Sequence, residues 1–318
     1  MTKRVATIGL LAFLALDIVL VVLALRPPRT TDAAPTVPTP VTTSSTSVGA
    51  TPTTGDTTST GSTSTTGTGS AGSRPAPLTV IVNGLDATVA WKATTGTCGS
   101  GGATLAVTKN GGARWSVVKA PTEAISRVQP LDTQRAFVVG ASTACRLRQY
   151  STTDLGSSWT GPSAVSGGWA RRLDQPSTVV TPAQDAAQPC GGKAVVDLSR
   201  TSAQQAQALC VNGDIVETGD GGQTWVSAGK ASEAVALANR SASGRVTTYV
   251  ARVVPSCDGV QIARVADGKD PVQLACVATT VPATPGRIAI STPDEGGWLV
   301  VGDETFTGTR DLKAWTKA

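Results

Sequence analysis

The chain has 318 residues, a formal net charge of +5, six cysteines and no histidine. Without histidine, catalysis by imidazole and metal binding by imidazole are excluded, and we expect no cofactor and no metal. Five of the 27 Lys and Arg residues and three of the 22 Asp and Glu residues precede residue 77, so the rest of the chain is nearly balanced in charge. That balance argues against a nucleic-acid partner.

Residues 6–25 form an almost wholly apolar run that follows Lys3 and Arg4. As a helix, this run is long enough to cross the hydrocarbon layer of a membrane, which is roughly 30 Å thick. We therefore expect residues 1–26 to be a cytoplasmic tip and a transmembrane signal anchor. A cleaved signal peptide is the alternative, with a distant cleavage site at Ala33 and Ala34, but the length of the run favours the anchor.

Residues 27–76 are rich in Thr, Ser, Pro and Gly and contain almost no large apolar side chains. Such a segment cannot bury enough surface to offset the entropy lost on ordering, so we expect a disordered linker. Residues 77–318 then form one folded domain. All six cysteines lie in that domain, which indicates an oxidising compartment. The predicted location is the cell membrane, single-pass, with the carboxy-terminal domain outside the cytoplasm.

One short turn recurs along this domain. Residues 218–225 read Thr-Gly-Asp-Gly-Gly-Gln-Thr-Trp, in which the carboxylate can accept backbone N–H bonds and the glycines permit positive φ. Similar turns, two of them degenerate, lie at residues 108–115, 152–159, 265–270 and 309–315. The structural positions of this motif are Asn110, Trp115, Asp154, Trp159, Asp220, Trp225, Asp311 and Trp315. The last turn is one residue short.

The turns recur about every 44 residues, which is the size of a four-stranded propeller blade. Two apolar runs around a polar turn precede each of them, at residues 78–93, 125–141, 194–211, 234–252 and 286–302. The interval between the second and third turns is longer. It predicts an insertion near residues 166–189; a decayed sixth blade is the alternative, but no further turn motif occurs there.

This arrangement resembles the Asp-box, or BNR-like, β-propellers of sialidases, sortilin-type receptors and photosystem II assembly factors. The resemblance implies an all-β fold, a propeller of about five four-stranded blades, here preceded by the transmembrane helix and the linker. It also implies that the Asp-box residues are structural turns on the rim and carry no catalytic role.

Strand alternation separates the loops into two faces. The Asp-box turns share a face with the first hairpin turn of each blade, and the remaining loops lie on the opposite face. On that opposite face we expect a binding cluster of Trp169, Arg171, Arg172 and Asp174 from the insertion, together with the loop that holds Asp258. The alternative is that Trp169 packs the insertion down and the charges are solvated.

The cysteine positions predict disulfides. Cys190 with Cys210 and Cys257 with Cys276 each flank one hairpin or turn, so each pair can bridge neighbouring strands. This leaves Cys98 with Cys145, in similar loops of two neighbouring blades, as a staple between blades.

The favoured function is a membrane-tethered module that binds or scaffolds a protein or glycan partner at the cell surface, with no catalytic residue assigned. A sialidase-type glycoside hydrolase is one alternative. The resemblance implies that such an enzyme would need a tyrosine nucleophile, for which only Tyr150 and Tyr249 are available, and an arginine cluster. An assembly factor for a membrane complex is the other alternative.

Overall fold

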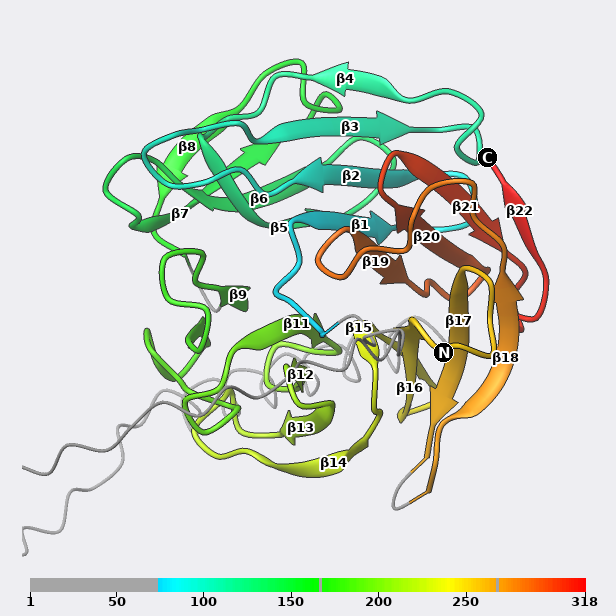
Figure 1. The fold of residues 1–318 in the computed structure, drawn as a ribbon. Helices are drawn as coiled ribbons and strands as arrows, with labels where there is room; N and C mark the ends of the chain where they lie inside the picture. Colours follow the sequence, from blue (N-terminus) through cyan, green and yellow to red (C-terminus); the bar gives the residue numbers. More distant parts are fainter. Residues whose placement is uncertain (1–73, 166–167, 267–268) are drawn as a thin grey trace, which may run out of the picture. The chain divides into compact units, whose positions relative to one another are not determined.

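The computed structural model describes residues 74–165, 168–266 and 269–318, and these residues form an all-β propeller (Figure 1). Within these three segments, no helix has the length and hydrophobicity needed to span a bilayer. The expected membrane helix and all but the last three residues of the expected linker lie outside the described residues.

Five sheets of four antiparallel strands follow one another along the chain, and each is one blade. Blade 1 consists of β1 (Val80–Gly84), β2 (Ala90–Thr94), β3 (Thr104–Thr108) and β4 (Ser116–Val118). Blade 2 consists of β5 (Ala124–Pro130), β6 (Ala136–Ala141), β7 (Leu147–Thr152) and β8 (Thr160–Ser163). Blade 3 consists of β11 (Val195–Arg200), β12 (Ala206–Cys210), β13 (Asp214–Thr218) and β14 (Val226–Lys230). Blade 4 consists of β15 (Ala234–Ala242), β16 (Arg245–Arg252), β17 (Val260–Val265) and β18 (Val272–Val277). Blade 5 consists of β19 (Ile288–Ser291), β20 (Gly297–Val301), β21 (Glu304–Gly308) and β22 (Trp315–Lys317).

The expected insertion is a two-stranded hairpin of β9 (Ala170–Arg171) and β10 (Val179–Val180). Its strand β9 contacts β5 of blade 2 and β11 of blade 3. The first strands of the blades also contact one another around the ring, β1 with β5 and β19, and β15 with β11 and β19. The predicted five blades are therefore confirmed, and the hairpin fills the remaining place among the inner strands.

The recurring turn is held by its own polar side chains. In blade 3, the Thr218 hydroxyl donates to Asp220 Oδ1 (2.7 Å) and accepts the N–H of Gly222 (3.1 Å). Asp220 Oδ1 accepts the N–H of Thr224 (3.0 Å). Blades 1 and 2 repeat these bonds, with Asn110 serving in blade 1 because an amide oxygen can accept the same N–H bond. The motif is a structural turn in all three blades.

The Asp-box turns lie beside the first hairpin turn of the same blade. Backbone bonds join Gly111 to Thr88, Leu155 to Gln134 and Gly221 to Gln204, at 2.9–3.0 Å from nitrogen to oxygen. Both kinds of turn therefore occupy one face of the propeller, as strand alternation predicts, and we call it the Asp-box face.

Edge-to-face tryptophan pairs fill three of the spaces between neighbouring units. The pairs are Trp91 with Trp159, Trp298 with Trp115, and Trp169 with Trp225, with ring centroids 6.0–6.2 Å apart. In each pair, one tryptophan belongs to an Asp box and the other belongs to the unit that precedes it around the propeller. The hairpin thus contributes a ring in the same way as a blade, because its Trp169 is almost fully buried against the Asp-box tryptophan of blade 3.

Blade 5 departs from this pattern because its Asp box is one residue short. Trp315 Nε1 donates to the Leu312 carbonyl of the same turn at 2.9 Å. The Trp315 ring lies so close to Gly297 and Gly308 that a Cβ at either glycine would meet it at 2.7–2.8 Å. Trp315 therefore packs on its own blade. On blade 4, the Arg240 guanidinium lies over the Tyr249 ring.

Two of the three expected disulfides are formed. Cys190 is bonded to Cys210 and Cys257 to Cys276, each pair with 5.6 Å between Cα atoms. The third pair is not bonded in this structure, since Cys98 and Cys145 are free thiols. They lie on loops of two different blades, so no single local turn or strand pair fixes their geometry, whereas the other two pairs are fixed in that way.

Trp298→Ala should lower the free energy of unfolding by about 3–5 kcal/mol, since it leaves a large cavity where blade 5 meets blade 1. Trp298 is fully buried, and its Nε1 donates to the Asp86 carbonyl of blade 1. Urea unfolding of the full-length chain measures the loss. Val117→Ala is the control, because Val117 is 83% exposed and its truncation should cost under about 0.5 kcal/mol. Equal losses in the two variants would contradict the closing role of Trp298.

The Asp-box carboxylates predict a loss of stability in acid. The Ser158 hydroxyl and the other donors to Asp154 lower the pKa of that carboxyl from 3.8 to about 2. The pKa of Asp220 is lowered in the same way, with the hydrogen bond from the Thr224 hydroxyl as the largest cause. Because the folded pKa is the lower one, the stabilisation is complete above pH 3.8 and disappears as the pH falls through about 2.

Asp154→Asn with Asp220→Asn should fold, as the natural Asn110 does in blade 1, and should flatten this decline in the free energy of unfolding. Urea unfolding at a series of pH values below about 5 measures the slope. Asp258→Asn, at an exposed loop position, is the control and should keep the slope of the parent. An unchanged slope in the double variant would refute the assignment.

Candidate binding site in the central channel

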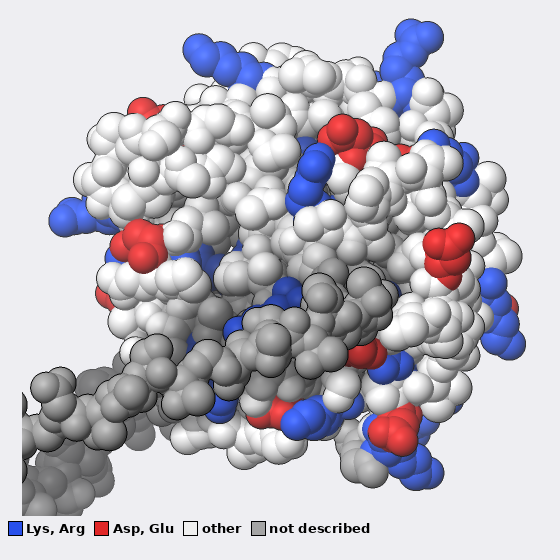
Figure 2. Space-filling model, in the orientation of Figure 1, with Lys and Arg blue, Asp and Glu red and all other residues white. Residues whose placement is uncertain are grey.

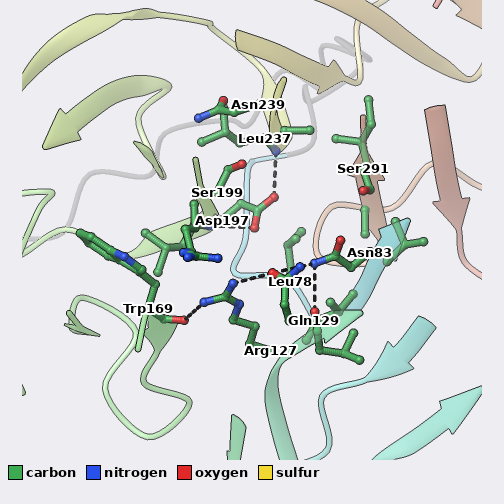
Figure 3. A pocket seen from close by; sticks show the side chains of 18 of the residues that line it. Leu78, Asn83, Arg127, Gln129, Trp169, Asp197, Ser199, Leu237, Asn239 and Ser291 are labelled. Atoms are coloured by element: carbon green, nitrogen blue, oxygen red, sulfur yellow. Dashed lines mark hydrogen bonds between the residues drawn. The ribbon is translucent and has the colours of Figure 1, made fainter. Parts of the chain in front are cut away.

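One polar residue stands at the same place near the end of every inner strand. Each follows an apolar residue and precedes the first hairpin turn, and we call the set the polar ring: Asn83, Gln129, Ser199, Asn239 and Ser291. All five line a cavity of about 340 Å³ that runs between the inner strands (Figure 3). The five repeats thus build one polar collar around the channel.

The incoming chain closes one end of this channel. Leu78 N–H donates to the Val196 carbonyl of blade 3 (3.1 Å), while the Leu78 carbonyl accepts from Arg171 Nη2 (2.9 Å). The next residue, Thr79, donates to the Gly286 carbonyl before blade 5 (2.7 Å). The stretch before β1 therefore crosses the ring, as Figure 1 shows, and seals the end away from the Asp boxes.

The other end is open. A vestibule of about 390 Å³ joins Gln129, Asn239 and Thr292 of the channel to residues of the first hairpin turns, among them Asp86 and Asp294. Those turns lie on the Asp-box face. A ligand can therefore reach the polar ring from the Asp-box face.

Arg127 places a positive charge on the channel wall. Its guanidinium donates to the Trp169 carbonyl (3.2 Å) and to Gln129 Oε1 (2.5 Å) and forms no ion pair with any carboxylate of the described residues. Burial, with a smaller contribution from the like charge of Arg200, lowers the pKa of Arg127 to about 9. The group still carries its proton at neutral pH, so its charge lacks a counter-ion.

Asp197 is the single carboxylate among the described residues that line the channel. Its Oδ1 accepts the N–H of Leu198 and its Oδ2 accepts the N–H of Leu237, both at 2.8 Å. Burial raises the pKa of Asp197, and the positive charge of Arg171 opposes that rise. Asp197 therefore balances the charge of Arg171 and leaves that of Arg127 unbalanced.

Two polar side chains at the open end have no partner. Both amide atoms of Asn239 and the hydroxyl of Thr292 are buried and form no hydrogen bond with the described residues. Such buried groups cost about 1–3 kcal/mol each when left unsatisfied. By contrast, Asn83 donates to the Val128 carbonyl (3.0 Å) and Ser291 accepts the N–H of Gly84 (3.0 Å). The polar ring is thus hydrogen-bonded at Asn83 and Ser291 and unsatisfied at Asn239, and the neighbouring Thr292 is unsatisfied as well.

The structure divides the binding cluster expected from sequence. Trp169 is a core residue, and Arg171 is buried in the channel, where it holds Leu78. Arg172 and Asp174 form a partly exposed ion pair (2.9 Å), and Asp258 lies on a blade 4 loop. The guanidinium of Arg172 lowers the pKa of Asp174 through their hydrogen bond.

The polar ring and Arg127 were not singled out from the sequence. The signal was present, since each of the five hairpins has a polar residue after an apolar one at the same distance from its turn. The sequence argument favoured the face opposite the Asp boxes, whereas the channel opens on the Asp-box face. On the face drawn in Figure 2, Lys and Arg alternate with Asp and Glu and form no single patch.

No family model matches the chain, and no curated protein matches it either. Among solved structures, it is similar to YCF48 bound to a D1 peptide, with 18% identity, 78% of this chain and 73% of that chain covered, and a TM-score of 0.30. It is also similar to the fucose-specific lectin from Aleuria aurantia, with 13% identity, coverage of 75% and 93%, and a TM-score of 0.44. It is similar as well to the Trypanosoma rangeli sialidase in complex with the inhibitor DANA, with 11% identity, 76% of this chain and 54% of that chain covered, and a TM-score of 0.40. These similarities concern the fold alone. The five four-stranded sheets and the repeated turn make the described part of the chain a β-propeller with Asp-box turns.

The free thiols of Cys98 and Cys145 predict a third disulfide under oxidising conditions. The Cys145 thiol lies beside Cys98, and burial, followed by this neighbouring thiol, raises the pKa of Cys98 to about 12. A diamide oxidant should take one hydrogen from each thiol and join blades 1 and 2 through an S–S bond, which peptide mapping of the full-length chain detects. Cys98→Ser is the control and should form no such link. Two alkylatable thiols after oxidation would contradict the prediction.

Proposed function

We propose that this protein is a membrane-tethered binding module that holds an anionic group of a partner in the open end of its channel. The observation that carries the proposal is the unpaired charge of Arg127, in the same cavity as the unsatisfied polar groups of Asn239 and Thr292. A buried charge without a counter-ion is costly, and an anion would supply the acceptor atoms that the guanidinium lacks, while the amide and the hydroxyl offer donors elsewhere on the same cavity wall.

The shape of the channel supports a protruding group of a partner as the ligand. Leu78 crosses the far end, and the cavity of about 340 Å³ is large enough for a side chain or one sugar ring. The partner would then cover the Asp-box face. A protein with an exposed carboxylate or a glycan with an acidic sugar meets these requirements.

The proposed location outside the cytoplasm is supported by two observations. The domain has two disulfides, which persist in oxidising compartments. The sequence before it contains the apolar run of residues 6–25 and the Thr- and Ser-rich residues 27–76. A single-pass anchor with a long tether would present the propeller at the cell surface.

Binding without hydrolysis fits the channel better than glycoside hydrolysis does. Glycosidases generally need two carboxylates, or a tyrosine nucleophile in sialidases. The described walls of the channel hold Asp197 alone, and both of its oxygens accept backbone N–H bonds. Tyr249 lines a groove between blades 4 and 5, and Tyr150 lies on β7, so neither tyrosine is on the channel wall.

The test uses the full-length chain purified in a non-ionic detergent, with acetate, glucuronate, phosphate and sulfate as probes. Thermal unfolding is recorded at constant ionic strength against chloride. We expect at least one probe to raise Tm in a saturable way, because a ligand that binds only the folded state stabilises it. Arg127→Gln should abolish the rise, and Arg127→Lys should retain part of it.

Arg135→Gln is the matched control, since Arg135 is an exposed arginine that pairs with Asp132 at 2.5 Å. It removes the same charge from the surface and should leave the Tm rise intact. No saturable rise with any probe, or an equal loss in Arg127→Gln and Arg135→Gln, would overturn the proposal.

A further inference from the structure

A second recess lies between blade 4 and the Asp box of blade 5, outside the channel. It is a groove of about 580 Å³, which we call the blade 4–5 groove. Its lining residues share a cationic and partly apolar character: Arg240, Tyr249, Arg264, Leu274, Arg310 and Lys313. Thr309 and Asp311 complete the wall.

The groove exists because the blade 5 turn is short. In three other spaces around the ring, an Asp-box tryptophan packs edge-to-face against a tryptophan of the preceding unit. Here Trp315 lies over the glycines of its own blade, and blade 4 offers Tyr249 with Arg240 over its ring at 5.5 Å. The space that a tryptophan pair would fill remains open to solvent.

The charged side chains of this groove differ in whether they already have partners within the protein. Arg240 is occupied, because it donates to the Thr292 carbonyl (3.3 Å) and the Gly296 carbonyl (2.7 Å) and so ties blade 4 to blade 5. Asp311 is occupied too, since it accepts from the Thr309 hydroxyl and the Lys313 N–H.

The remaining cations of the groove are available to a partner. The side chains of Arg264, Arg310 and Lys313 are exposed and form no ion pair within the described part of the chain. Asp311 is the one carboxylate among the described residues that line the groove and offsets part of this charge near Lys313, so these lining residues carry a net positive charge, which favours an anionic partner.

Apolar side chains on the outer strand decide which anionic partner fits. Val272 pairs directly across from Arg264 and is 49% exposed, and Leu274 lines the groove itself. The cationic side chains of the groove thus have one apolar side chain in the same wall and another beside it. A sulfated polysaccharide has no large apolar groups to cover Val272 and Leu274, whereas a peptide can supply both carboxylates and aliphatic side chains.

We propose that the blade 4–5 groove is a docking site for an acidic peptide segment that also carries aliphatic side chains. The carboxylates of the segment pair with Arg264, Arg310 and Lys313, and its aliphatic side chains cover Val272 and Leu274. This site is separate from the anion site of the channel and does not depend on it.

The test measures fluorescence anisotropy of a labelled peptide of alternating glutamate and leucine with the full-length chain. A peptide with glutamine in place of glutamate is the charge control. We expect the triple variant Arg264→Gln, Arg310→Gln, Lys313→Gln to bind the acidic peptide about tenfold more weakly, since exposed ion pairs contribute modestly and here act together. The three side chains are exposed, so the fold should be preserved.

A matched triple variant, Lys109→Gln, Arg114→Gln, Lys119→Gln, removes the same charge from exposed positions around the blade 1 Asp box. It should bind like the parent, and so should Arg127→Gln, because the channel is a different site. Equal weakening by both triple variants would show general electrostatic attraction and overturn the proposal. Absence of binding by the parent would overturn it as well.

Val272→Ser tests the apolar half of the proposal. It should weaken binding of the glutamate–leucine peptide and leave binding of poly-glutamate unchanged, because poly-glutamate has no aliphatic side chain to cover Val272. Heparin, a sulfated polysaccharide, is the competing probe. If heparin binds the groove more tightly than the peptide and Val272→Ser affects neither, the groove is a polyanion site and the peptide proposal is wrong.

Discussion

The propeller depends on the edge-to-face packing of tryptophans between neighbouring units. Each pair joins the ring of an Asp box to a ring of the preceding unit, so the hydrogen bonds that shape the turn also fix the packing between blades. This packing between neighbouring units matters most where blade 5 meets blade 1. Every blade is built from four consecutive strands, so no strand is exchanged to close the ring. Side-chain packing, above all Trp298 on Trp115 with its bond to Asp86, has to close it.

Where the tryptophan pair is lacking, the spaces between blades become polar grooves. Blades 3 and 4 enclose one of about 970 Å³, lined among others by Lys230, Arg252 and Asp270, and blades 4 and 5 enclose the cationic groove around Arg264. Both lie next to the degenerate turns of the repeat. Loss of the motif therefore removes apolar packing and at the same time leaves a recess between the blades. The regular repeats hold the fold, and the irregular ones leave the recesses on which the docking proposal rests.

The sequence predicted the features that depend on local chemistry. A turn with Thr, Asp or Asn, Gly and Trp forms from bonds within eight residues, so its recurrence gave the blades, and the two local disulfides followed from flanking positions. Features that depend on the closed ring were not predicted. Trp169 faces Trp225 only after the hairpin takes a place among the blades. The polar ring becomes a site only when five distant strands share an axis.

The closure of the channel links the site to the way the chain joins the propeller. Residue 74 is the first described residue, and four residues later Leu78 crosses the end of the channel away from the Asp boxes, where Arg171 holds its carbonyl. Whatever precedes the propeller is therefore attached beside the closed end. The open end, with Asn239 and Thr292, lies on the Asp-box face. The described chain thus enters the propeller on one face, and the channel opens on the other, so the segment that closes the channel and the residues that line its mouth belong to opposite ends of the inner strands.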